Sequence, residues 1–207
     1  MAEITIVGCG PGNKKFASSE ALHTINRAEI LIGSPRLIGE FQTHQECIPF
    51  SSVTETIHSL KNIRGRNCAL LVSGDPGFYS LSQSIVHEFG IDSVRIIPGI
   101  STITYAFSKL GIPWHDALFL SAHHTLPENL NERVQNNKKL GILTSPKHTA
   151  SRLVSYLDKR IAGQCVFYIG EWLSYKNESL RRYFYNEIPE VSGGAPSVLL
   201  ITKLERV

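Results

Sequence analysis

Three short apolar segments, each followed at once by a glycine-containing loop, constrain this sequence most. The segments are 4–7, 68–72 and 94–97, and the loops after them are 8–12 (GCGPG), 73–79 (SGDPGFY) and 98–102 (PGIST). Short apolar runs that end at glycine are typical of buried strands. Segments with helical spacing separate them, so the pattern predicts a parallel sheet with helices on both faces. Ligands bind such sheets at the carboxyl ends of the strands, where these loops lie.

The rest of the chain follows this alternation at first and then departs from it. In the first half we expect helices at 16–29, from 34, 52–62, 78–89 and 101–110, and further strands at 30–32 and 47–50. After a linker at 112–116 we expect strands at 118–121, 140–143, 166–169 and 198–201, and helices at 129–134 and 149–157. The α/β fold should therefore comprise an N-terminal parallel α/β domain over 1–113, with the three loops, and a C-terminal mixed α/β domain over 114–207.

Composition narrows the class of protein. A net charge of +3 over 207 residues is too small for the dense basic face of a nucleic-acid-binding protein. No apolar run approaches the roughly 20 residues that cross a membrane, and no secretory signal opens the chain. The four cysteines form no CxxC pair, so we expect buried thiols in a reducing compartment and no metal site. The sequence predicts a cytoplasmic protein.

The first loop has two interpretations. It is a glycine turn between strand and helix, or the start of the GxGxxG fingerprint of a dinucleotide-binding site. Asn13 stands at the third glycine position, and Pro11 lacks the backbone N–H that a pyrophosphate would accept from. The strand at 30–32 ends without an acidic residue for a ribose. These features disfavour an NAD-linked oxidoreductase, which stays as an alternative.

The second and third loops combine capping residues with candidate ligand contacts. Asp75 is placed to cap the helix expected at 78–89, with Pro76 in its first position. The same carboxylate suits a ribose hydroxyl or a sulfonium cation. Ser101 or Thr102 can cap the following helix or direct its hydroxyl at a ligand.

The order and spacing of the three loops resemble the tetrapyrrole methylase family. The resemblance covers Ile4 to about His123. Residues 110–114 (LGIPW) and 118–123 (LFLSAH) are most similar to the members that methylate C5 of a (cobalt-)precorrin in cobalamin biosynthesis. The resemblance implies an S-adenosyl-L-methionine-dependent methyltransferase, a homodimer, built from two α/β domains with the cofactor in the cleft between them.

The resemblance also implies particular site residues. The implied cofactor contacts are Pro11, Asp75, Phe78, Tyr79, Ser101, Thr102, Leu143 and Pro196. The catalytic residue is unassigned, and His123 is the candidate that takes up the proton lost from the methylated carbon, although it reads equally as an ordinary surface histidine. Arg36, Lys14 and Lys15 are candidate partners of substrate carboxylates or solvated surface charges.

The implied partners are a tetrapyrrole substrate, namely a cobalt-precorrin, and a separate C15-methyltransferase/decarboxylase. The latter is expected because one set of glycine loops implies one cofactor site, and the sequence stops at Val207. Other interpretations are a methylase that acts at another ring position, the oxidoreductase, and a non-catalytic nucleotide-binding module.

Overall fold

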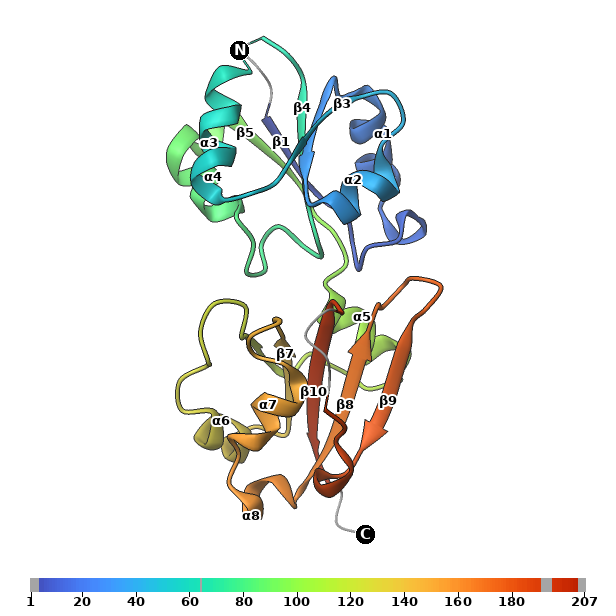
Figure 1. The fold of residues 1–207 in the computed structure, drawn as a ribbon, viewed down its shortest axis with the longest axis vertical. Helices are drawn as coiled ribbons and strands as arrows, with labels where there is room; N and C mark the ends of the chain where they lie inside the picture. The colour runs from blue at the N-terminus through green and yellow to red at the C-terminus, as the bar shows by residue number, and fades with distance from the viewer. Residues whose placement is uncertain (1–3, 64, 191–194, 205–207) are drawn as a thin grey trace. The chain divides into compact units, whose positions relative to one another are not determined.

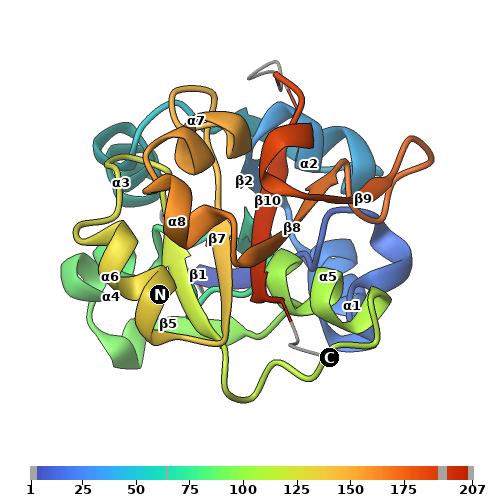
Figure 2. The same cartoon turned by 90° about the horizontal axis from the view of Figure 1, so that it is seen from below.

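The computed structural model describes residues 4–63, 65–190 and 195–204, and it divides the chain into two compact units, Met1–Ser101 and Thr102–Val207 (Figures 1 and 2). The sequence placed the boundary between 113 and 114, beyond helix α5 (Thr102–Lys109). In the structure α5 belongs to the second unit, because Ile103 and Phe107 pack against Gly141 of that unit's sheet.

The first unit contains one five-stranded sheet in the order β3-β2-β4-β1-β5, and every neighbouring pair is parallel. Its strands are β1 (Ile4–Gly8), β2 (Ile30–Gly33), β3 (Glu46–Pro49), β4 (Cys68–Val72) and β5 (Val94–Ile97). The central strands β1 and β4 are buried on both faces, which explains their uninterrupted apolar sequences. The expected parallel sheet is confirmed.

Helices cover both faces of this sheet. Those of the first unit are α1 (Ser19–Arg27), α2 (Pro35–Phe41), α3 (Val53–Asn62) and α4 (Ser82–Phe89). Successive strand residues point to opposite faces. Accordingly, Val7 packs in the core beneath α1 and α2, and Ile6 packs in the core beneath α3 and α4 (Figure 1).

Two helix starts differ from expectation. Helix α4 begins at Ser82 rather than at 78, because Tyr79 adopts a left-handed φ of 49° and Asp75 bonds loop backbone instead of capping a helix. Helix α1 begins at Ser19, since Ser18 caps it and residues 14–16 form a separate 3₁₀ turn. Helix α3 begins at Val53 within the expected range, and Ser52 caps it because its Oγ accepts from the N–H of Glu55.

The second unit contains a mixed sheet in the order β6-β7-β10-β8-β9, in which only β6 and β7 run parallel among the described strands. Its strands are β6 (Leu118–Ser121), β7 (Lys139–Leu143), β8 (Cys165–Glu171), β9 (Ser179–Tyr183) and β10 (Ser197–Lys203). Besides α5, its helices are α6 (Leu130–Asn136), α7 (Ala150–Ser155) and α8 (Lys159–Ala162). The expectation of two α/β units, the second one mixed, is confirmed.

None of the described helices combines the length and the apolar content that a membrane span requires.

A half-buried carboxylate fixes α5 to the segment between β8 and β9. Glu178 accepts hydrogen bonds from the Tyr105 hydroxyl (2.7 Å) and the Ser174 N–H (2.6 Å), and Lys109 Nζ lies 3.1 Å from its other oxygen. Burial opposes ionisation of Glu178, but these donors outweigh it and lower the pKa of the carboxyl. Burial also raises the pKa of Tyr105 to about 12, with Glu178 contributing. The pair is therefore an ionised carboxylate and a neutral phenol at neutral pH.

We expect Glu178→Gln to lower the free energy of unfolding by about 1–3 kcal/mol at neutral pH, because three donors lose a charged acceptor. A lowered folded-state pKa adds stability above the pKa of the unfolded glutamate, and this stability is lost as the pH falls through the folded value. Urea unfolding at neutral pH and at about pH 3.5 should therefore show a smaller difference between variant and wild type in acid. Glu128→Gln, at an exposed glutamate, is the control and should change little; equal losses in both variants would contradict this account.

Candidate functional site

The three glycine loops of the first unit lie side by side, because they follow the neighbouring strands β4, β1 and β5. Backbone hydrogen bonds join the first two loops. The N–H of Gly10 donates to the Gly74 carbonyl (3.2 Å), and the N–H of Gly74 donates to the Gly10 carbonyl (2.7 Å). The N–H of Cys9 donates to Val72 at the end of β4 (2.9 Å). The hydrogen bonding of the sheet thus continues from β1 and β4 into the first two loops.

Asp75 ties the second loop to the third. Its Oδ1 accepts from the N–H of Gly77 (2.8 Å) within the same loop, and its Oδ2 accepts from the N–H of Gly99 (3.0 Å) in the loop after β5. A carboxylate oxygen has two acceptor positions, so each oxygen can accept one further hydrogen bond from a ligand hydroxyl. Asp75 therefore positions both loops and keeps acceptor capacity.

The loops approach one another too closely for any side chain at the contact. A Cβ at Gly99 would lie 2.3 Å from the Gly74 carbonyl oxygen and 2.8 Å from the Gly8 carbonyl carbon. A Cβ at Gly8 would lie 2.6 Å from the Gly99 nitrogen. Gly74 itself has a φ of 73°, which favours glycine. The sequence shows these glycines, but their mutual contact depends on the strand order.

Two aromatic rings follow Asp75 in the second loop. The rings of Phe78 and Tyr79 meet edge to face with their centroids 4.8 Å apart. Tyr79 is 56% exposed and occupies the left-handed region, which is costly for a residue with a side chain. Strained backbone positions of this kind occur often at functional sites.

The other expected contacts lie at the ends of the first and third loops. Pro11 is buried in the first loop, and Ser101 is buried where the third loop ends. Thr102 is the first residue of α5 and is partly exposed. The chain thus places Pro11, Asp75 and Ser101 around one edge of the first unit's sheet.

A cation lies beside the second loop. Arg36 Nη2 is 3.4 Å from Ser73 Oγ, and the positive charge of Arg36 opposes the burial that raises the pKa of Cys9 to about 12. Cys9 therefore stays a neutral thiol and is no nucleophile at neutral pH. Lys14 and Lys15 lie further along the chain in the 3₁₀ turn after the first loop, and both are exposed.

In the second unit, the residues expected at a cofactor are held by the start of β10. Thr144, next to Leu143, donates from its hydroxyl to the Ser197 carbonyl (2.8 Å). The two hydroxyls of Thr144 and Ser197 are 2.6 Å apart. The carbonyl of Pro196 accepts from the N–H of Trp172 (3.1 Å). Leu143 and Pro196 are thus the chain neighbours of Thr144 and Ser197, whose hydrogen bonds join the end of β7 to the start of β10.

His123 lies in the same cluster. Its Nδ1 is 2.8 Å from the Thr144 carbonyl oxygen. A carbonyl only accepts, so Nδ1 must carry the hydrogen, and Nε2 of the neutral ring must carry the lone pair. His123 is exposed, and this tautomer makes Nε2 a proton acceptor.

Sequence reasoning missed His148 in the loop after β7. The residue is only 8% exposed, and its Nδ1 has no hydrogen-bond partner among the described residues. A turn closed by Ser145 holds it, since His148 N–H donates to Ser145 Oγ and the N–H of Ser145 donates to the His148 carbonyl, both at 3.1 Å. The sequence shows only a histidine in a polar loop, and its burial depends on packing.

We expect Gly99→Ala to lower the free energy of unfolding by about 1–3 kcal/mol, because its methyl group would overlap backbone atoms of two other loops. Gly39→Ala in α2 is the matched control. Nothing lies within 4 Å of the added methyl group there, so the same change should stabilise the protein by about 0.4–1 kcal/mol. Urea unfolding measures both. A neutral Gly99→Ala would show that the loops are not packed backbone to backbone.

Known proteins are similar to this chain in sequence. The sequence model of the tetrapyrrole (corrin/porphyrin) methylase family matches residues 3–189. The cobalt-precorrin-7 C(5)-methyltransferase of Salmonella typhimurium is 29% identical over 179 residues, which are 86% of this chain and 88% of the relative. A probable cobalt-precorrin-7 C(5)-methyltransferase of Methanocaldococcus jannaschii is 25% identical over 211 residues, or 98% and 97% of the two chains.

A solved structure shares the fold. The uroporphyrin-III C-methyltransferase of Thermus thermophilus, complexed with S-adenosylhomocysteine, aligns with a TM-score of 0.73 and 17% identity, over 97% of each chain. The family match spans all three glycine loops and includes Thr144 and His123. The chain therefore belongs to the tetrapyrrole (corrin/porphyrin) methylases.

Proposed function

We propose that this chain is an S-adenosyl-L-methionine-dependent C-methyltransferase that adds a methyl group to C5 of a (cobalt-)precorrin in cobalamin biosynthesis. The observation that carries the C5 position is that two relatives with this named activity align with most of the chain, one of them end to end. The loops of the first unit supply the supporting chemistry.

The loop residues fit the cofactor. An adenosyl group needs an aromatic or apolar surface for its base and acceptors for its ribose hydroxyls, and the sulfonium favours a nearby carboxylate. Tyr79 offers an exposed ring, and Asp75 offers acceptor positions beside closely packed backbone. The proposed contacts are Pro11, Asp75, Phe78, Tyr79, Ser101, Thr102, Leu143 and Pro196. When bound, the cofactor supplies a methyl group on a positively charged sulfur.

Positioning is the main task of the protein in this reaction. Holding two reactants in line can lower a barrier by roughly 7–11 kcal/mol relative to free encounter. The backbone contacts of Gly8, Gly74 and Gly99 and the two hydrogen bonds of Asp75 give the loops little freedom to move. Rigid loops are what such positioning requires.

The substrate carbon gains a methyl group and loses its hydrogen as a proton, so the reaction needs a proton acceptor. We assign this role to Nε2 of His123, whose lone pair follows from the contact between Nδ1 and Thr144. Arg36 is the proposed partner of a substrate carboxylate, because its guanidinium lies beside the second loop.

The product identifies the methylated carbon. Incubation of the chain with cobalt-precorrin-7 and cofactor labelled with ¹³C in the methyl group should give one added methyl by mass spectrometry, and carbon NMR should place it at C5. No carbon dioxide should be released. A methyl group at another carbon would be consistent with the family but would contradict methylation at C5. A reaction mixture with NAD in place of the labelled cofactor should yield no product.

The assignment of His123 is tested by His123→Asn. The asparagine amide can still donate to the Thr144 carbonyl, but it offers no basic nitrogen. We expect kcat to fall about 10²–10⁴-fold, with S-adenosylhomocysteine affinity unchanged. His87→Asn, at an exposed histidine of α4, should have neither effect. A His123→Asn enzyme with wild-type kcat would leave water or another group as the proton acceptor.

A further inference from the structure

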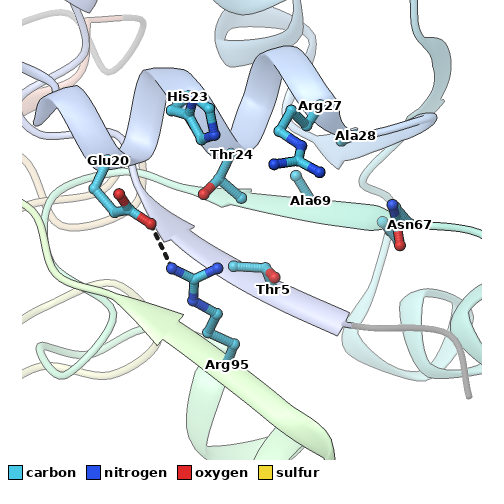
Figure 3. Close-up of a pocket in the computed structure, with 10 residues that line it drawn as sticks. Thr5, Glu20, His23, Thr24, Arg27, Ala28, Asn67, Ala69 and Arg95 are labelled. Carbon is cyan, nitrogen blue, oxygen red and sulfur yellow. Dashed lines mark hydrogen bonds and ion pairs between the residues drawn. The ribbon is translucent and has the colours of Figure 1, made fainter.

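A cavity of about 370 Å³ lies between α1 and the sheet of the first unit (Figure 3). Its helix wall includes His23, Thr24 and Arg27, and its sheet wall includes Thr5 and Arg95. The small side chains of Ala28 and Ala69 also line it, so the space beside the last turn of α1 is not filled by packing.

This cavity is separate from the glycine loops. Thr5 pairs with Ala69 and with Arg95 near the amino ends of β1, β4 and β5. The first loop begins at Gly8, three residues further along β1, and a strand rises by about 3.3 Å per residue. Roughly 10 Å of strand therefore separates the cavity floor from the proposed cofactor contacts.

The lining carries excess positive charge. Arg27 and Arg95 contribute two guanidinium groups, while Glu20 is the one acidic residue among the described residues that line the cavity. Glu20 forms an ion pair with Arg95 (Figure 3). The charge of Arg27 is therefore not matched by a second carboxylate in this lining.

The arginine side chains are directed at the cavity. Figure 3 shows the guanidinium of Arg27 descending from α1 toward Ala69, and that of Arg95 lying beside Thr5. Thr5, at the floor of the cavity, is only 4% exposed, whereas the side chains of Arg27 and Arg95 are exposed at its rim.

We propose that this cavity binds a small polyanion that carries carboxylate or phosphate groups. The planar guanidinium of Arg27 can bind either group through two parallel hydrogen bonds, and Arg95, although paired with Glu20, adds further N–H donors. The hydroxyls of Thr5 and Thr24 and the amide of Asn67 provide neutral hydrogen-bonding groups around the same space. The proposal does not depend on the identity of the methylation substrate.

Isothermal titration calorimetry of the full chain tests the site, with citrate as the carboxylate probe and pyrophosphate as the phosphate probe. Sodium chloride keeps the ionic strength constant. We expect saturable binding of one molecule of at least one probe, and the probe that binds identifies the chemical source. Arg27→Gln should weaken this binding about tenfold or more. No saturable binding of either probe would overturn the proposal.

Two controls make the result specific. Arg160→Gln removes an exposed arginine of α8, and it should leave affinity unchanged; equal weakening by Arg160→Gln and Arg27→Gln would indicate nonspecific charge attraction and overturn the site. Saturating S-adenosylhomocysteine should not displace the probe. Displacement would indicate that the anion binds at the glycine loops, and it would overturn the proposed site. Arg27 is exposed in the last turn of α1, so melting without probe should show the variant folded.

Discussion

The two hydrogen bonds accepted by the Asp75 carboxylate organise the first unit's candidate site. One comes from Gly77 in its own loop, and the other comes from Gly99 in the loop after β5. They require the third loop to approach the second, and that approach is possible only because Gly8, Gly74 and Gly99 carry no side chains. The strand order, the glycines and the Asp75 carboxylate therefore depend on one another. The exposed ring of Tyr79 follows Asp75 in the second loop.

The second unit fixes its loops by the same kind of contact. Side chains there bond backbone carbonyls: the hydroxyl of Thr144 bonds Ser197, and the ring of His123 bonds Thr144. The second of these contacts selects the tautomer of His123, so a structural hydrogen bond determines which nitrogen can accept a proton. In the same unit, Glu178 has a structural role, because its hydrogen bonds and ion pair hold α5 against the segment between β8 and β9.

The sequence predicted the sheet because buried parallel strands and their glycine ends have a strong local pattern, as in 68–72. The sequence prediction was wrong at the start of α4. Asp75 is a residue type that often caps helices, but here its carboxylate accepts a hydrogen bond from Gly99, in the loop after a neighbouring strand. Gly99 and Asp75 are 24 positions apart, so no local pattern reveals their bond. The burial of His148 and the cavity beside Arg27 also depend on tertiary packing, and sequence patterns alone did not indicate them.

The central claim is that the Asp75 bridge forms a cofactor site, and calorimetry with S-adenosylhomocysteine tests it most directly. Asp75→Asn keeps the size of the side chain but replaces one acceptor with an N–H donor that faces a backbone N–H. The account predicts that the wild-type chain binds one S-adenosylhomocysteine and that the variant binds it at least about tenfold more weakly while remaining folded. Equal affinity in the two proteins, or no binding by the wild type, would contradict it.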